Sequence, residues 1–347
     1  MGNVRKIFIF IFIFCSVLIN GQDAVFSQFY HNPISTNSAL TGVFNGKNRV
    51  GTIYRNQWYS VEPNASLTTT DLFYDSKINV LKNDFLGIGI MLFDDRAGLA
   101  EIAKTHGYLN LAYSKHLYNN KYRELNQYLV FGAQFGYGVT YLKSSGFLFG
   151  SQFDKLSETV DPSLPSGENL LTSKVYPDIN TGLVWYYTSR KSTLYLGVAV
   201  SHLNRPDISL VDGSVDRLYM QYSGLIGGEF SLVDNLSVLP AIYFNAEGQV
   251  MQGVLGTNFR YEYYEKDKNA FRIGIWTRVT NTISGFSIPD IIFSTILEFN
   301  DIELGLSYDV TVSNLSAVNG YKGAFELSLI YIWGDNPEYH SLKCPRF

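Results

Sequence analysis

The sequence predicts an all-β protein: a transmembrane antiparallel β-barrel of about 14 strands with an ordered N-terminal lead segment. Three observations predict it: an N-terminal export signal, the lack of any later apolar run long enough for a membrane-spanning helix, and widespread alternation of apolar with small or polar residues. The 347-residue chain is 15% aromatic and only 17% charged, whereas soluble domains are about 25% charged. With 27 Lys and Arg against 31 Asp and Glu, it has no basic excess for non-specific nucleic-acid binding.

We expect residues 1–21 to be a signal peptide. Arg5 and Lys6 form a short positive region, and residues 7–19 are an uncharged, mostly apolar run. The run is shorter than the roughly 20 residues that a membrane-spanning helix needs, and this order of charge, apolar run and polar boundary is typical of a secretory signal. Cleavage is expected after Gly21, and a retained membrane anchor is the alternative.

Cleavage would leave Cys344 as the only cysteine. A single thiol excludes an internal disulfide and a zinc site built from several cysteines. After the signal peptide no apolar run reaches about 18 residues, so the sequence predicts no transmembrane helix. An exported chain can still span a membrane as a closed barrel, because lipid offers no partner to unpaired backbone groups.

The alternation is clearest in residues 302–310. Leu304 and Leu306 fall on one face of the expected strand, and Glu303 and Ser307 fall on the other. A period of two indicates a strand with one apolar and one polar side. Elsewhere the second face is mostly small or uncharged, as the lumen side of an outer-membrane barrel requires. The alternative, a soluble β-sandwich, would carry more Lys, Glu and Asp on its wet face.

Fourteen strands are expected in residues 47–333, which we predict to be the barrel. Tyr and Trp near strand ends fit aromatic girdles at the membrane interfaces; they are Trp58, Tyr186, Tyr187, Tyr263, Tyr264 and Trp333. The expected strands are about 47–56, 66–76, 85–95, 105–117, 127–142, 179–189, 193–202, 218–231, 236–246, 249–261, 271–279, 289–299, 301–312 and 325–333.

The connections between these strands predict the sidedness. With a periplasmic N-terminus the odd-numbered connections face outward, and the longest, 143–178, is odd, whereas tight turns such as 190–192 are even. Long outer loops and short periplasmic turns are typical of outer-membrane barrels. Residues 334–347 are expected to be a C-terminal tail.

Two segments suggest specificity without catalysis. Residues 22–46 carry aromatic rings without strand alternation, and we interpret them as an ordered periplasmic lead or plug. The second segment, residues 54–58, ends the first strand. We expect its Arg55, Asn56 and Gln57 side chains to point at the lumen or rim, and Trp58 to lie at the membrane interface. The candidate structural or partner-docking residues are Phe26, Ser27, Gln28, Phe29, Tyr30, Asn32, Pro33, Tyr54, Arg55, Asn56, Gln57 and Trp58.

Residues that could carry chemistry are scarce. The five His residues form no zinc-binding pair, and there is no nucleophile elbow, phosphate-binding loop or dinucleotide fingerprint. His202 beside Ser201 is the best local hydrolase candidate, but a hydrogen-bonded structural histidine is the better interpretation. Asp94 and Asp95 could bind calcium in a loop or simply be solvated acids in a turn, and Cys344 could cross-link or stay unpaired. We therefore predict no catalytic residue, no metal site, no cofactor and no enzymatic activity.

Several motifs resemble the PorP/SprF family of type IX secretion system membrane proteins. The family's opening motif appears as Asp23, Phe26 to Phe29, Asn32 and Pro33, with Phe29 where Tyr is commoner and Ala24 where Pro is usual. Its Tyr-Arg-Asn-Gln-Trp motif appears at 54–58. Further similar stretches, in order along nearly the whole mature chain, are 151–154, 200–206, 305–310 and 344–347.

The resemblance implies an integral outer-membrane barrel of the type IX secretion or gliding machinery. Such proteins support secretion or cell-surface attachment of large adhesins. The implied partners are the outer-membrane bilayer, other secretion-system components, a periplasmic peptidoglycan-associated lipoprotein and a large secreted adhesin. Two alternatives from other functional classes are a porin or hydrophobic-solute channel, with 143–178 as a constricting loop, and an outer-membrane hydrolase.

Overall fold

The structure is a computed structural model that describes most of the chain after the expected signal peptide. The described residues are 23–59, 66–81, 83–98, 102–120, 125–142, 150–154, 159–161, 163–164, 171–264, 269–282, 285–334 and 344–345. The signal peptide predicted at 1–21 and most of the predicted tail at 334–347 lie outside these residues, so both stay predictions.

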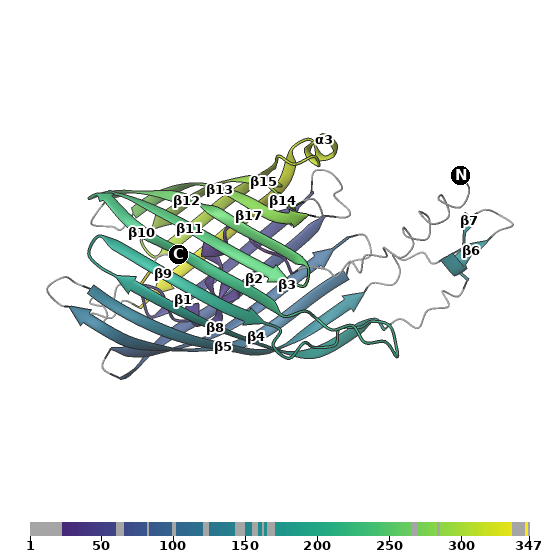
Figure 1. Cartoon of the computed structure of the whole chain (residues 1–347), viewed down its shortest axis with the longest axis horizontal. Helices are drawn as coiled ribbons and strands as arrows, with labels where there is room; N and C mark the ends of the chain where they lie inside the picture. Colours follow the sequence, from purple (N-terminus) through teal and green to yellow (C-terminus); the bar gives the residue numbers. More distant parts are fainter. Residues whose placement is uncertain are drawn as a thin grey trace.

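A closed barrel of fourteen antiparallel strands forms the body of the molecule (Figure 1). All fourteen predicted strands are present, although several are longer than expected because the alternation fades near their ends. The wall strands are β1 (Asn48–Gln57), β2 (Leu67–Leu81), β3 (Asp84–Ala97), β4 (Ile102–Asn120), β5 (Leu125–Leu142), β8 (Ser173–Thr188), β9 (Ser192–Ser201), β10 (Gln221–Val233), β11 (Leu236–Glu247), β12 (Val250–Tyr264), β13 (Asn269–Thr282), β15 (Asp290–Phe299), β16 (Ile302–Thr311) and β17 (Lys322–Trp333).

Each strand pairs with its sequence neighbours, and the ring closes where the first strand meets the last. In this seam Asn48 lies opposite Trp333 and Gln57 lies opposite Ala324. Short extra elements lie outside the wall: a hairpin of β6 (Phe153–Asp154) and β7 (Thr159–Val160), strand β14 (Gly285–Ser287) and helix α3 (Ser316–Asn319). Closure leaves the wall without a free edge, as a lipid environment requires.

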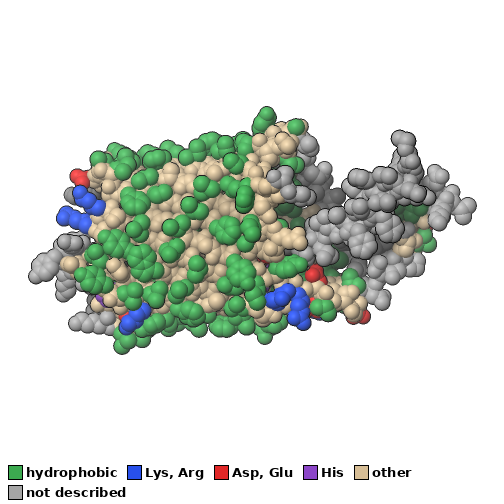
Figure 2. All heavy atoms as spheres, viewed as in Figure 1, with side chains coloured by type: hydrophobic (Ala, Val, Ile, Leu, Met, Phe, Trp, Pro, Cys, Tyr) green, Lys and Arg blue, Asp and Glu red, His purple; other side chains and the backbone are tan. Residues whose placement is uncertain are grey.

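The outer and inner faces of the wall alternate as predicted. Leu306 and Leu329 are 55% and 44% exposed, whereas Ser307 between strands β15 and β17 is buried. On the face shown in Figure 2, apolar side chains are spread over the wall, and charged ones lie near its two ends. Tyr186 is the exception to the predicted girdle: it is fully buried and stacks on Tyr128 with ring centroids 4.9 Å apart. Its position in the alternation points it inward, because its neighbours Trp185 and Tyr187 take the other face.

The two ends of the barrel differ in their connections. The long-connection end holds the links after β1, β3, β5, β9, β11, β13 and β16, including residues 143–172 and 202–220. The short-turn end holds the links after β2, β4, β8, β10, β12 and β15, such as 234–235 and 300–301. The link after β11 is a tight exception, only residues 248–249. The contrast matches the predicted parity, and the assignment of the short-turn end to the periplasm stays a prediction.

The core of the molecule is the lumen, because the chain fills it with its own N-terminal segment. Residues 23–47, hereafter the plug, form η1 (Phe29–His31), α2 (Pro33–Thr36) and η2 (Ser38–Leu40) inside the ring (Figure 1). The plug's Phe29, Tyr30, Leu40 and Val43 share one buried apolar cluster with wall residues such as Trp276. Among the described residues no helix is long and apolar enough to cross a membrane.

Candidate functional site

The plug runs the length of the lumen. It starts at Asp23 among strand ends of the long-connection end and finishes at Lys47, whose N–H donates to the Trp333 carbonyl at the short-turn end. We had expected Asp23–Pro33 to lie on the periplasmic side. With outward odd-numbered connections, the structure instead starts this segment at the opposite end and carries it through the barrel. The expectation followed from the position of β1 alone, which does not reveal that the preceding chain doubles back through the ring.

An ion-pair cluster holds the start of the plug. The Asp23 carboxylate lies 2.9 Å from His202 Nε2 and 3.3 Å from Lys104 Nζ, and the Asp23 N–H donates to Glu247 at 3.0 Å. His202 Nδ1 lies 2.8 Å from Asp178.

These contacts set the charge of His202. Burial alone would lower the pKa of His202, but hydrogen bonds to Asp178 and Asp23, together with their charges, raise it to about 10. Burial likewise opposes ionisation of Asp23, yet Lys104 and His202 hold its pKa well below its usual range. The raised pKa of His202 and the lowered pKa of Asp23 favour the charged forms of both groups, so an ion pair fixes the start of the plug.

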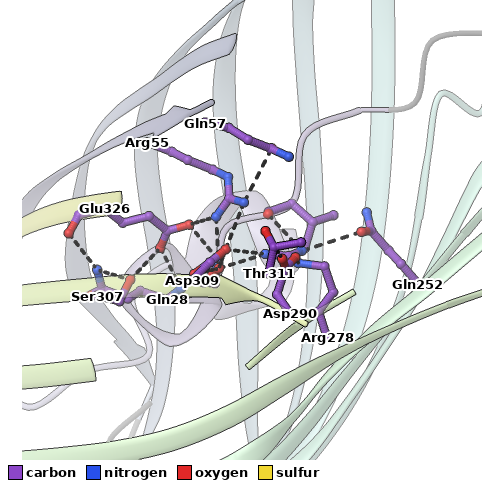
Figure 3. Close-up of polar contacts among 12 residues, drawn as sticks. Gln28, Arg55, Gln57, Gln252, Arg278, Asp290, Ser307, Asp309, Thr311 and Glu326 are labelled. Carbon is purple, nitrogen blue, oxygen red and sulfur yellow. Dashed lines mark hydrogen bonds and ion pairs between the residues drawn. The ribbon is translucent and has the colours of Figure 1, made fainter. Parts of the chain in front are cut away.

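A second buried network joins the plug to the seam (Figure 3). The N–H groups of Ser27 and Gln28 donate to the two Glu326 carboxylate oxygens at 2.6 and 2.8 Å. Ser27 Oγ donates to Asp309 at 2.8 Å and accepts from Arg55 Nη1 at 2.9 Å. Arg55 also contacts Glu326 at 2.5 Å and Asp309 at 2.9 Å. The Arg55 guanidinium on β1 thus bridges Asp309 on β16 and Glu326 on β17. The plug donates further hydrogen bonds to the same two carboxylates.

Arg278 on β13 extends this network around the wall. Its Nη2 donates to Ser27 Oγ at 2.7 Å, and its Nε lies 3.6 Å from Asp290. Two guanidinium groups and three carboxylates therefore meet in one buried cluster, drawn in Figure 3. Buried charges are tolerated only when paired and hydrogen-bonded, so the cluster specifies a single position for Ser27.

Aromatic contacts hold the middle of the plug. Phe29 stacks on Tyr243 with centroids 5.4 Å apart and meets the Trp276 edge at 5.5 Å. Tyr30 lies 5.2 Å from the same indole ring. Phe26 packs in a separate buried cluster with Ile53 of β1 and other wall residues. Each such buried side chain contributes about 1.5–3 kcal/mol, so the three rings together stabilise the seated plug by several kcal/mol.

The rest of the plug uses polar contacts and close backbone approach. Asn32 donates to Asp71 of β2 at 2.9 Å, and Pro33 starts α2 at a position that needs no N–H donor. On the wall, Gly132 allows contact with the plug backbone: a Cβ there would lie 2.3 Å from the Ala39 nitrogen. Gly87 does the same beside Thr41, where a Cβ would lie 2.2 Å from the carbonyl oxygen.

The end of the plug meets the C-terminal residues. The Cys344 N–H donates to Asn45 Oδ1 at 2.8 Å, and Asn45 Nδ2 donates to the Cys344 carbonyl at 3.2 Å. The buried thiol lies 3.4 Å from Lys77 Nζ, which also donates to the Phe44 carbonyl at 2.7 Å. Cys344 is thus part of the lumen packing, a position that makes it a poor cross-linking group.

The second predicted segment, 54–58, divides between two faces. Arg55 and Gln57 point into the lumen, and Arg55 Nη2 lies 3.5 Å from Gln57 Oε1. Asn56, expected to point inward or to the rim, shares the face of Tyr54 and donates to its hydroxyl at 3.1 Å, because neighbouring strand residues alternate. Trp58 follows the strand end, 38% exposed, with a φ of 63°.

The residues considered for chemistry have structural partners. Both ring nitrogens of His202 contact carboxylates, so neither is available to take a proton from Ser201. Asp94 and Asp95 lie within β3, and each accepts from a threonine hydroxyl, Thr105 and Thr69 respectively. Within the described residues no group of three or more His, Cys, Asp or Glu could hold a metal ion.

Two cavities lie on either side of the plug. A small one of about 70 Å³ near the long-connection end is bordered by Phe26 and Phe29. A larger one of about 570 Å³, hereafter the vestibule, lies toward the short-turn end and is bordered by Tyr30 and His31. The two share no lining residue. The vestibule carries charges of both signs, for example Arg260 paired with Glu298 at 2.8 Å.

Several residues of this site are not among the predicted candidates, namely Lys77, Gly87, Gly132, Glu247, Arg278, Asp290, Asp309 and Glu326. Charged residues on the polar face of an alternating strand were the available signal, since Glu326 and Asp309 interrupt otherwise apolar stretches. A charge on the inner face of a barrel needs a partner inside the lumen. The glycines carried no such signal, because their role depends on how closely the plug approaches.

The closed wall with an apolar outside and its own chain inside defines the protein as a plugged outer-membrane β-barrel. The model of the type IX secretion system membrane protein PorP/SprF matches residues 18–331, and the chain belongs to this family. The residues that carried the resemblance at Ser27, Gln28, Arg55, His202 and Asp309 are the ones that meet around the plug.

Solved structures share the barrel fold at low similarity. One is a TodX monoaromatic hydrocarbon channel mutant, with 12% identity, a TM-score of 0.46, and 87% of this chain and 93% of that chain covered. Others are the Ralstonia pickettii toluene transporter TbuX (11%, TM-score 0.44, 86% and 91%) and CdiB from Acinetobacter baumannii (7%, TM-score 0.45, 82% and 60%). Comparison with curated proteins finds no match.

Proposed function

We propose that the protein is a non-enzymatic outer-membrane barrel of the type IX secretion or gliding machinery that supports secretion or surface attachment of large adhesin-type proteins. The observation that carries the proposal is the convergence of family-motif residues on the plug, Ser27 and Arg55 above all. A filled lumen does not suit a conduit for a large polypeptide, so the barrel acts as an anchoring or docking component beside the translocation route.

The proposed partners follow from the two ends. The vestibule at the short-turn end would face periplasmic components of the machine, including a peptidoglycan-associated lipoprotein, while the long-connection end would face the adhesin. This orientation requires export by the signal peptide at 1–21 and its cleavage. The plug, held at Asp23, at Ser27 and through the contact of Asn45 with Cys344, would couple the two ends of the barrel mechanically.

Replacing Phe26, Phe29 and Tyr30 by Ala tests the proposal. These rings are at most 5% exposed, so their loss removes several kcal/mol of plug packing while leaving the wall strands intact. We expect the variant to reach the outer membrane, measured by fractionation and heat-modifiable migration, but to secrete or retain less adhesin. The control replaces three exposed rings on the outer face of the wall, Phe131, Phe259 and Phe293, and should secrete normally.

The alternative is a channel for small or hydrophobic solutes. The 143–178 loop was its expected constriction, yet the described β6–β7 hairpin of this loop lies beyond the long-connection end in Figure 1, and the plug occupies the lumen. Planar-bilayer recording separates the two functions. We expect little conductance from the parent protein. A rise in conductance in the triple variant with secretion intact would favour the channel, and parental secretion and conductance in that variant would contradict a functional plug.

A further inference from the structure

The small cavity near the long-connection end has an unusual lining. Its volume of about 70 Å³ holds about five water molecules. Five side-chain amides border it, together with the hydroxyls of Ser35, Thr36 and Ser201. The amides come from the plug and from four different wall strands or strand ends: Asn32, Gln134, Asn180, Gln221 and Asn245.

Part of this amide lining has no protein partner. Asn245 on β11 is 1% exposed, and among the described residues neither its Nδ2 nor its Oδ1 has a hydrogen-bond partner. Asn32 Oδ1 also lacks one. A buried donor or acceptor without a hydrogen-bond partner destabilises the fold, so a polar ligand in the cavity would satisfy these atoms.

The cavity is open to solvent, and its charges are already paired. Ser35 is the only plug residue between Phe26 and Phe44 that is exposed, and it borders the cavity. Asp23 and His202, the clearest charges in the lining, pair with each other at 2.9 Å. The cavity therefore presents neutral donors and acceptors, with no unpaired charge to attract an ion.

Apolar surfaces complete the lining. Phe26, Phe29, Phe93 and Tyr243 contribute aromatic rings. Neutral hydrogen-bonding groups together with aromatic rings suit a ligand that carries hydroxyls on its rim and C–H groups on its faces. The hydroxyls can hydrogen-bond to the amides, and the C–H faces can pack on the rings.

We propose that this cavity binds an uncharged, hydroxylated ligand of the size of a single sugar residue. The displaced water corresponds to roughly 150 Å³ of liquid, which is enough for one such ring. The ligand would reach the site from the long-connection end, past Ser35 and the strand ends at Ser201 and Gln221. The inference does not depend on the secretion role, because it concerns binding by the isolated barrel.

The test uses the full-length mature protein in detergent. Glucose is titrated by calorimetry and by saturation-transfer NMR, and glucuronate serves as the charged comparison. We expect saturable glucose binding that is at least tenfold stronger than binding of glucuronate. Asn245→Leu, which keeps the side-chain size, should weaken glucose binding at least tenfold.

A matched control separates the site from general packing. Asn110 on β4 is also fully buried, and neither of its amide atoms has a partner in the part of the chain that the structure describes, but it is not part of the cavity lining. Asn110→Leu should bind glucose like the parent. If the parent protein is a heat-modifiable barrel but shows no saturable glucose binding, the cavity holds only water and the proposal is overturned. Equal losses of glucose binding in Asn245→Leu and Asn110→Leu would also overturn it. Binding of N-methylacetamide with the same Asn245 dependence, without glucose binding, would instead indicate a peptide ligand.

Discussion

The plug contacts two separate parts of the wall in different ways. At the seam, strands β1, β16 and β17 meet it with charges: Arg55, Asp309 and Glu326 surround Ser27. On the wall of β4, β5 and β8, away from the ion-pair cluster at Asp23, the middle of the plug meets glycine and neutral groups. Here Gly132 touches Ala39, and Gln134 Nε2 donates to the Ile34 carbonyl at 3.0 Å.

The difference shows two ways to place a segment inside a ring. A buried ionic network specifies one position, because any displacement leaves charges unpaired. A wall of glycine and amides specifies only shape, and small shifts there cost little beyond packing. The ionic contacts at the seam and at Asp23 therefore set the register of the plug, and the glycine wall sets how deeply it can seat.

The largest expected effect comes from breaking the seam network. Arg55→Met leaves buried Asp309 and Glu326 short of a cation, and breaking a buried pair costs about 3–5 kcal/mol. We expect a large fall in the heat-modifiability midpoint or in denaturant resistance. The control is Arg96→Met, which removes an exposed pair to Asp94 at 2.7 Å that is worth about 0–1 kcal/mol. Equal shifts of the midpoint in Arg55→Met and Arg96→Met would show that the buried seam network stabilises the barrel no more than an exposed ion pair does.

The outer face of the same seam offers a second test. Leu306→Arg places a charge in lipid and costs about 2–4 kcal/mol near the midplane, so the assembled amount in outer membranes should fall. Its neighbour Ser307 is a poor lumen control, because Gln28 Nε2 donates to it at 3.2 Å and the plug leaves no room for Arg. Ser231, exposed in the vestibule, is suitable, and Ser231→Arg should assemble normally. Equal assembly of Leu306→Arg and Ser231→Arg would contradict the face assignment.

The smallest effect is expected on the glycine wall of β4, β5 and β8. Gly132→Val drives a Cβ into the plug backbone, and overpacking costs typically about 1–3 kcal/mol. We expect the barrel to fold with a displaced plug, detected as faster proteolysis of residues near Asp23. Gly224→Val is the control, since a Cβ there meets nothing within 4 Å. If the plug in Gly132→Val resists proteolysis like the parent, the wall accepts a larger side chain at this position than its geometry indicates.

The sequence predicts the wall better than the lumen, for a physical reason. Alternation records which face of each strand meets lipid, so Leu306 and Leu329 could be assigned directly. The inner face records contacts with a segment distant in sequence, and nothing in the pattern around Arg55 says that its partners are Asp309 and Glu326. The aromatic density at Phe26, Phe29 and Tyr30 did predict an ordered plug-like segment. Its direction through the barrel could not be predicted, because that depends on pairings such as Asp23 with His202.

The seam network also bears on the order of assembly. Ser27 and Gln28 bind β16 and β17, the last strands to be synthesised, while Arg55 belongs to the first. Before β17 is in place, Ser27 and Gln28 lack the Glu326 carboxylate to which they donate, and β1 lacks a strand partner on one side. Docking of the segment and joining of the first and last strands then depend on the same carboxylates. We therefore expect ring closure and lumen filling to be one cooperative event, so that a barrel finished without its interior is not a populated intermediate.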